Sequence, residues 1–407
     1  MDVNRTVEAV WRTESAHLVV ALTRLVNDVG LAEDIAQETF AAALQQWPAE
    51  GVPDNPAAWL MTVGRRRAID VIRREQARIE KYEQIAREPS DEDQSEDMLA
   101  LVFVACHPVL SRESRAALTL RMVAGLSTEE IARAFLVPAA TMGQRISRAK
   151  RTLAEAHVPF AVPNDTELPA RLDAVLEVIY LVFAEGHSAT SGDTWVRVDM
   201  AEEAMRLGRR LASLLPKQPE VHGLVALMEL QASRFRARVG PHGEAVLLAD
   251  QDRSRWDHTL ISHGQAQLTR AVRMGGPLGP YSVQAAIAGI HARAGTFAET
   301  DWEAIIALYD ALAEIAPSPV VALNRAVAVM HADGPEAALA ALDEIRDDPR
   351  MARYHLYGAV RADVLRHLGR HTEAAAELEQ AADLAPTQHE RNLLMERAAA
   401  AADNRPL

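Results

Sequence analysis

The chain of 407 residues contains a single cysteine, Cys106, so no disulfide can form within it. Aromatic residues make up only 5% of the sequence. No apolar run approaches the roughly 20 residues that a membrane-spanning helix requires, and the N-terminus lacks the basic and apolar segments of a signal peptide. These absences exclude a disulfide-stapled secreted domain, and they predict a soluble protein of the reducing cytoplasm with no membrane partner.

Positive charge is also in short supply. The chain carries 43 Lys and Arg against 57 Asp and Glu, which gives a formal net charge of −14. So acidic a chain is a poor general binder of nucleic acid, and any such contact must come from local basic surfaces. What the chain has instead is abundant alanine and few β-branched runs, which predicts an all-α protein of two or three domains.

The clearest local pattern lies between Leu126 and Lys150. Ser127 and Glu130 form the S-x-x-E of a capping box, which predicts a helix beginning at Ser127. Pro138 interrupts that helix and suits the first turn of a second one. The second helix has a buried stripe at helical spacing: Met142, Ile146, Ala149 and Leu153. Its outer positions are polar or basic: Thr141, Gln144, Arg145, Arg148 and Arg151.

A short capped helix, a tight turn and a basic helix are the parts of a helix-turn-helix, whose second helix reads base edges in the major groove. The alternative is an ordinary helical hairpin with a solvated basic face. Gly143 lies inside the second helix and costs about 1 kcal/mol of helix propensity relative to alanine. It either permits close approach to a DNA backbone or is simply tolerated.

Two helices are expected at the N-terminus. The first covers about residues 5–29 and ends at Gly30. The second begins at Leu31 and carries a polar surface made of Glu33, Asp34, Gln37 and Glu38. Acidic residues in a first helical turn complement the helix dipole, and the same surface could also recognise a basic partner.

A third helix, Ala57 to Lys81, follows the proline-rich loop Pro48–Pro56. Its middle is the most basic stretch of the chain, with five arginines in ten positions: Arg65, Arg66, Arg67, Arg73 and Arg74. These arginines form either a solvated face or a surface that tracks the phosphates of single-stranded nucleic acid. Trp47 and Trp59 bracket the loop, and each could stack on a base or belong to the core. The acidic run from Glu88 to Asp97 has no hydrophobic period and is expected to be a linker.

The half of the chain from about Leu168 is again helical. Three stretches that resemble one another begin at Asp301, Asp333 and Gly369. Their Glu-Ala pairs, which start at Glu303, Glu336 and Glu373, are 33 and 37 residues apart. A small-residue-rich helix pair that recurs near this period is typical of tetratricopeptide repeats, which usually bind a protein or peptide partner. The alternative is a generic helical bundle.

Signals for catalysis are weak. Four histidines, His222, His242, His258 and His263, lack the spacing of metal ligands on one helix turn. Cys106 is interpreted as a small buried residue rather than a nucleophile. One charged motif stays unassigned, either an internal salt-bridge network or a contact with the N-terminal modules: Asp250, Asp252, Arg253, Arg255, Trp256 and Asp257. We expect no enzyme activity, no cofactor and no metal.

Three stretches together resemble one family. AEDIAQETFAAALQQW, followed by NPAAWLMTVGRRRAIDVIRRE, resembles region 2 of the extracytoplasmic-function sigma factors of bacterial RNA polymerase. LSRESRAALTLRMVAGLSTEEIARAFLVPAATMGQRISRAK resembles their region 4. The remainder is similar to the long C-terminal extension of one subgroup, which contains tetratricopeptide-like repeats. That subgroup has an Asn and a Tyr within the stretch that is Ala184 to His187 here, and this sequence departs from both.

The resemblance implies a domain order: region 2 at residues 1–82, an acidic linker at 83–98, region 4 at 99–160 and the extension at 168–407. It implies a non-enzymatic initiation factor that binds core RNA polymerase and promoter DNA. Its linker would run through the polymerase's basic RNA path. The alternative from another class is a one-component helix-turn-helix regulator with a C-terminal sensor domain, which would bind duplex DNA without polymerase.

The resemblance also implies three binding surfaces. The clamp helices of the largest catalytic subunit would be contacted by Asp34, Gln37 and Glu38. The −10 element would be taken by the Pro48–Pro56 loop with Trp59, Arg65, Arg66, Arg67, Arg73 and Arg74. The −35 element would be read by Thr141, Gln144, Arg145, Arg148, Lys150 and Arg151. Among these last, Arg145 and Arg148 are expected at the bases, and Lys150 and Arg151 at phosphates.

Overall fold

The structure is a computed structural model of the chain. It describes residues 3–75, 91–135, 137–187, 194–238, 240, 246–385 and 388–402. Within these ranges every regular element is a helix, so the all-α prediction is confirmed. The chain divides into two compact units, Met1–Pro216 and Lys217–Leu407, and each is described by itself.

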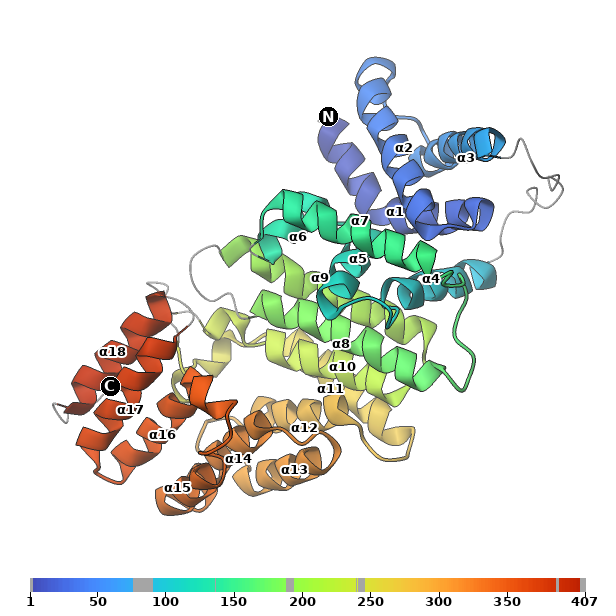
Figure 1. Cartoon of the computed structure of the whole chain (residues 1–407). Coiled ribbons are helices and arrows are strands. Elements are labelled where there is room, and N and C mark those ends of the chain that lie inside the picture. Colours follow the sequence, from blue (N-terminus) through green and yellow to red (C-terminus); the bar gives the residue numbers. More distant parts are fainter. Residues whose placement is uncertain are drawn as a thin grey trace. The chain divides into compact units, whose positions relative to one another are not determined.

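The first unit contains nine of the described helices (Figure 1): α1 (Val3–Val26), α2 (Val29–Glu50), α3 (Pro56–Glu75), α4 (Asp91–Ala105), α5 (Arg112–Met122), α6 (Thr128–Ala134), α7 (Ala139–Glu155), α8 (Leu168–His187) and α9 (Thr194–Leu214). The helices α1, α2 and α3 pack on one another around Leu18, Leu22, Trp47 and Leu60, each no more than 2% exposed. This is the three-helix part expected for region 2.

The break between α1 and α2 differs from the sequence prediction. Asn27, not Gly30, ends α1, because Asn27 adopts a left-handed φ of 54° that asparagine tolerates. Asp28 then caps α2, since its side chain accepts a hydrogen bond from the Leu31 backbone N–H at 2.9 Å. Gly30 lies inside the first turn of α2. The predicted loop is also shorter, because α2 continues through Pro48 and ends at Gly51, whose φ is 88°.

The predicted acidic linker is partly helical. Its residues up to 90 lie outside the described ranges, but Asp91 to Asp97 form the first turns of α4. Acidic residues suit the start of a helix, where they complement its dipole. Asp97 is buried and pairs with Arg24 of α1, with Nε and Oδ2 2.6 Å apart. For residues 91–97 the linker prediction is therefore wrong.

The helices α8 and α9, from the expected extension, lie in the same compact unit as α4 to α7. Two of their arginines donate to backbone carbonyls of this module, Arg171 to Phe103 at 2.8 Å and Arg206 to Ala124 at 3.3 Å. Val102 of α4 and Val123, which follows α5, also face apolar side chains of α8 and α9, with a residual void of only about 10 Å³ between them. The residues on the α8 and α9 side include Ile179, Leu207 and Leu211. The structure thus divides the chain near Pro216 rather than between residues 160 and 168.

The second unit contains the remaining described helices: α10 (Pro219–Ala232), α11 (His258–Arg273), α12 (Pro280–Arg293), α13 (Trp302–Ile315), α14 (Pro319–Ala332), α15 (Pro335–Glu344), α16 (His355–His367), α17 (His371–Leu384) and α18 (Gln388–Ala402). Short 3₁₀ turns lie between some of them: η1 (Phe235–Ala237), η2 (Leu248–Asp250), η3 (Arg253–Arg255) and η4 (Met351–Arg353). Proline occupies the first turn of α10, α12, α14 and α15, where its missing N–H costs nothing.

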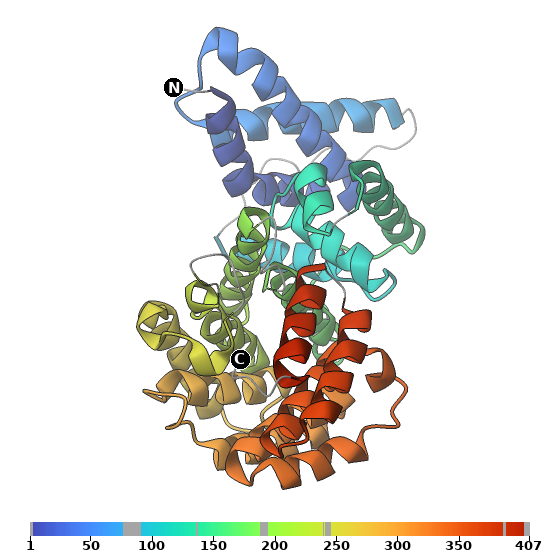
Figure 2. The same ribbon diagram turned by 90° about the vertical axis from the view of Figure 1, so that its left-hand side faces the viewer.

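The repeat prediction is confirmed as a series of helix pairs. From α13 to α18 each helix packs on the next, and the pairs follow one another from orange to red in Figure 2. The three Glu-Ala pairs lie near the beginning of α13, α15 and α17, the first helix of each pair. Neighbouring pairs share core residues, because Ile306 and Leu339 each pack against two successive apolar clusters. Such sharing is how repeats that cannot fold alone bury a continuous core.

Candidate nucleic-acid and partner-binding surfaces

The helix-turn-helix prediction is confirmed in its geometry. The Ser127 hydroxyl accepts from the Glu130 N–H at 3.1 Å, and the Glu130 carboxylate accepts from the Ser127 N–H at 2.7 Å. This reciprocal capping box begins α6, and Pro138 precedes α7. The four residues of the predicted stripe on α7 are all buried: Met142, Ile146, Ala149 and Leu153.

The outer face of α7 is polar and accessible. Four of the residues predicted to contact the −35 element are exposed: Thr141, Gln144, Arg148 and Arg151. Arg145 is half-buried and close enough to Glu113 to help lower the pKa of that carboxyl, although hydrogen bonds near the start of α5 lower it more. A Cβ at Gly143 would meet only Thr128, at 3.8 Å. Gly143 is thus tolerated rather than required by packing within the chain.

The basic face of α3 is also accessible. Arg66 and Arg73 are exposed and Arg65 is half-buried, and no ion pair is found for any of the three within the described ranges. Arg67 pairs with Glu38 of α2, with Nη1 and Oε2 3.0 Å apart. Trp47 is a core residue, and the half-buried Trp59 packs edge-to-face on it at 5.4 Å between ring centroids. The helical position of Arg74 is described, but its side chain lies outside the description.

The acidic face of α2 differs from the prediction at one residue. The Asp34 and Glu38 side chains are 61% and 65% exposed, as expected for a polar surface. Glu33, however, is 1% exposed, so its assignment to the surface is wrong. Helical periodicity places Glu33 on the side of α2 that meets region 4, and the sequence alone does not reveal that neighbour.

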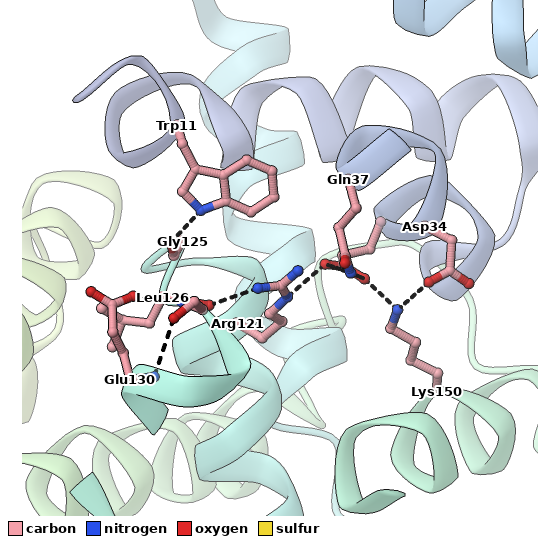
Figure 3. Close-up of polar contacts among 10 residues, drawn as sticks. Trp11, Asp34, Gln37, Arg121, Gly125, Leu126, Glu130 and Lys150 are labelled. Atoms are coloured by element: carbon pink, nitrogen blue, oxygen red, sulfur yellow. Dashed lines mark hydrogen bonds and ion pairs between the residues drawn. The ribbon is translucent and has the colours of Figure 1, made fainter. Parts of the chain in front are cut away.

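Glu33 is buried because donors from three places converge on its carboxylate (Figure 3). Arg121 of α5 donates through Nε at 2.8 Å, and Gln37 donates from one turn further along α2 at 2.5 Å. Lys150 of α7 also bonds Glu33, and it pairs with Asp34 at 2.7 Å. Lys150, which the resemblance places at a DNA phosphate, is only 13% exposed and is turned toward α2 in this structure.

A second set of contacts joins α1 to region 4. The Trp11 indole donates to the carbonyl of Gly125, and its ring lies 5.3 Å from the Arg121 guanidinium carbon. Gly125 has φ of +71°, and a Cβ there would lie 2.6 Å from the Ser15 hydroxyl. Arg12 pairs with Glu130 at 3.0 Å. Sequence reasoning missed Trp11, Arg121 and Gly125, because no local pattern distinguishes them from other core or surface residues.

These contacts surround a cavity of about 510 Å³ between α1, α2, α5 and α6. Trp11, Phe40 and Leu44 form the apolar part of its wall, and Leu44 is 46% exposed. Arg12 and Arg133 lie at the same cavity from opposite modules. We call the contacts of Figure 3 together with this cavity the region 2–region 4 junction.

The unassigned charged motif of the second unit is structural. Arg253 donates to the carbonyls of His291 and Ala294, which caps the end of α12, and its guanidinium lies 4.6 Å from the Trp256 ring. Asp257 caps the beginning of α11 by accepting from the Thr259 and Leu260 N–H groups. The motif therefore ties α11 to α12, and neither alternative offered from the sequence describes this role.

Two of the four histidines named from the sequence hydrogen bond to other side chains, and His258 is exposed. His222 contacts Gln267 at 2.7 Å, and His263 contacts the buried Glu229 at 2.5 Å. His242 lies outside the described residues. Across the ranges that the structure describes, no group of three His, Cys, Asp or Glu side chains could hold a metal ion. In the same ranges no helix is long and apolar enough to cross a membrane.

Cys106 is fully enclosed, which confirms its interpretation as a small core residue. Its sulfur lies 3.2 Å from the Thr119 hydroxyl, and burial raises the pKa of the thiol to about 11. At pH 8 we expect Cys106 in the folded chain to react with a maleimide at least about a hundredfold more slowly than an ordinary cysteine, because only the thiolate attacks. The check is the labelling rate with and without denaturant, and equal rates would contradict the prediction.

Comparison with known proteins agrees with the two modules. The family model described as "Sigma-70 region 2" matches residues 12–78, and that described as "Sigma-70, region 4" matches residues 101–153. "Probable ECF RNA polymerase sigma factor SigI" of Mycobacterium tuberculosis (strain CDC 1551 / Oshkosh) is 28% identical over 54% of this chain and 83% of its own length. The chain belongs to the extracytoplasmic-function sigma factors. Its long helical extension places it in the subgroup that carries one.

The descriptions of the matches that cover the extension name no function. The family model "Family of unknown function (DUF6596)" covers residues 171–272, which lie on both sides of the division at Pro216. "Uncharacterized protein R00370" of Rhizobium meliloti (strain 1021) is 44% identical over 91% of this chain and 90% of its own. The match to the crystal structure of yeast Tom70 covers 99% of this chain and 86% of the other at 13% identity, with a TM-score of 0.39.

Proposed function

We propose that this sigma factor binds bacterial core RNA polymerase and directs DNA-templated initiation at specific promoters. The observation that carries the proposal is the placement of its cations. Although the chain has a net charge of −14, α3 and α7 each present exposed arginines on the modules matched by regions 2 and 4. Local basic faces on an acidic chain are typical of contacts confined to two short DNA elements.

In this proposal each surface has its own task. Asp34, Gln37 and Glu38 of α2 face the basic clamp helices of the polymerase. The basic face of α3, with Trp59, takes the −10 element, where an unstacked base could be held beside the arginines. The outer face of α7 reads the −35 element, with Arg145 and Arg148 at the bases and Lys150 and Arg151 at phosphates.

The protein itself catalyses no reaction in this proposal, and it acts in the cytoplasm where its polymerase is. The repeats of the second unit are an interaction or regulatory module that receives a protein or peptide partner. They are built from the small-residue helix pairs that commonly form such binding surfaces.

Run-off transcription with purified core polymerase tests the proposal, on the promoter upstream of the gene's own neighbours. Transcripts that depend on the protein are the expected result. The absence of transcripts, together with tight binding to the same duplex without polymerase in a gel shift, would instead favour the one-component regulator.

Arg148→Ala is expected to weaken apparent binding to the promoter by about 1–3 kcal/mol, because an exposed arginine is lost from the helix that reads the DNA. Promoter-dependent transcription should fall accordingly. Arg273→Ala is the matched control, since Arg273 is also an exposed arginine on a helix but lies on α11 in the second unit. Titrating each variant against promoter at fixed salt measures the effect. If both variants bound the promoter equally well, α7 would not contact the DNA through Arg148.

A further inference from the structure

The region 2–region 4 junction engages the end of α2 that the proposed function assigns to polymerase. Asp34 is paired with Lys150, and the Gln37 amide is directed at Glu33. A basic partner that approached this end of α2 would have to displace Lys150 first. The side chains that would attract such a partner are therefore already satisfied within the chain.

The backbones of α2 and α7 also leave no room for a partner at this place. A Cβ built on Gly30, in the first turn of α2, would lie 3.2 Å from the Cβ of Lys150. On the other side of the junction the Gly125 backbone lies directly against Trp11 and Ser15. The Gly30 approach is to the Cβ of Lys150, which cannot move aside as a flexible side-chain end can, whereas the nearest neighbours of Gly125 are side-chain atoms of Ser15 and Trp11. Access to the side of α2 that carries Glu33 and faces Lys150 requires the two regions to separate.

The contacts of the junction are of a kind that can be exchanged. Most are hydrogen bonds and ion pairs, and the Arg12 and Asp34 side chains are more than half exposed. Glu33 gives up water for Arg121, Lys150 and Gln37, an exchange that yields little net stability although it demands specific geometry. When the junction opens, water or polymerase can replace the hydrogen-bond and ion-pair partners of these side chains. With these contacts formed, the outer face of α7, including Arg148, is still exposed.

We propose that the junction is a closed state of the free sigma factor in which Lys150 occupies the polymerase-binding end of α2, so that closure and polymerase binding exclude each other. This inference rests on the proposed function, and it adds an intramolecular competitor to the same surface. Because only the open fraction of the protein could bind polymerase, the closed contact lowers the apparent affinity for polymerase by that fraction.

The test uses the full chain with Arg12→Cys and Arg133→Cys, two exposed residues that line the junction cavity from opposite regions. Both are joined by a bis-maleimide whose spacer contains a disulfide, so that reductant releases the link. Cys106 does not compete for the reagent, because it is buried and its pKa is raised to about 11. The matched control joins Asp310→Cys to Arg325→Cys, an exposed ion pair between α13 and α14.

We expect the 12–133 link to form readily in the free protein and at least tenfold more slowly after saturation with core polymerase. Run-off transcription by the linked protein should fall at least tenfold and return on reduction, while the control link changes neither rate. Failure of the link to form in the free protein would overturn the closed state. Transcription by the linked protein at the level of the reduced protein would overturn the competition.

The proposed function and the closed state can be contradicted separately. If the reduced protein transcribes but polymerase leaves the linking rate unchanged, the proposed function stands and the closed competitor does not. If no variant and no wild-type protein supports transcription, the proposed function fails, and the competition fails with it.

Discussion

Replacing Glu33 by alanine is expected to weaken the region 2–region 4 junction by about 3–5 kcal/mol, because Arg121 and Lys150 would lose the carboxylate that compensates their charges. Leaving Arg121 without the carboxylate should cost more than leaving Lys150 without it. The Arg121 side chain is only 8% exposed, and its Nε has no other acceptor among the described contacts. The two regions can separate and hydrate these groups. We therefore expect opening of the junction before unfolding of either region.

Hydrogen exchange measures this effect directly. Amides of α6 and of the first turns of α2 should exchange faster in Glu33→Ala, while those in the core of α10 should not change. Glu38→Ala is the matched control, because Glu38 lies on the same helix but forms an exposed pair with Arg67, worth about 0–1 kcal/mol. If both variants change exchange at the junction equally, Glu33 does not hold it.

Removing everything after Pro163 is expected to prevent region 4 from folding normally, although the sequence places the extension outside that module. Val102 of α4 and Val123, which follows α5, would no longer be covered by Ile179, Leu207 and Leu211 of α8 and α9. Each fully buried aliphatic side chain contributes about 1.5–3 kcal/mol. A few such losses match the whole stability of a typical domain, about 5–15 kcal/mol.

A truncation after Pro216 keeps α8 and α9 and is expected to stay folded, because it ends where the first compact unit ends. Thermal melting followed by circular dichroism compares the two fragments, and a dye that binds exposed apolar surface reports the lost cover. Equal, cooperative melting of both fragments would show that α8 and α9 are dispensable. Only the longer fragment gives a clean measure of what the repeats contribute to transcription.

The local elements could be predicted from the sequence to a large extent. The capping box at Ser127 and Glu130 and the buried stripe of α7 depend on residues three or four positions apart, whose geometry the helix itself fixes. The same reasoning placed the exposed faces of α3 and α7 correctly. It failed at Gly30, where two local signals competed and Asn27 with Asp28 ended one helix and began the next.

By itself the sequence determined the all-α class, the order of the two sigma regions, the helix-turn-helix and the repeat in the C-terminal half. Only the tertiary structure decided that Glu33 is buried, that Lys150 turns toward α2, and that α8 and α9 belong with region 4. The two cationic partners of Glu33, Arg121 and Lys150, are 88 and 117 positions away along the chain. Helical periodicity fixes which face a residue lies on, but only the packing of distant helices decides what that face meets.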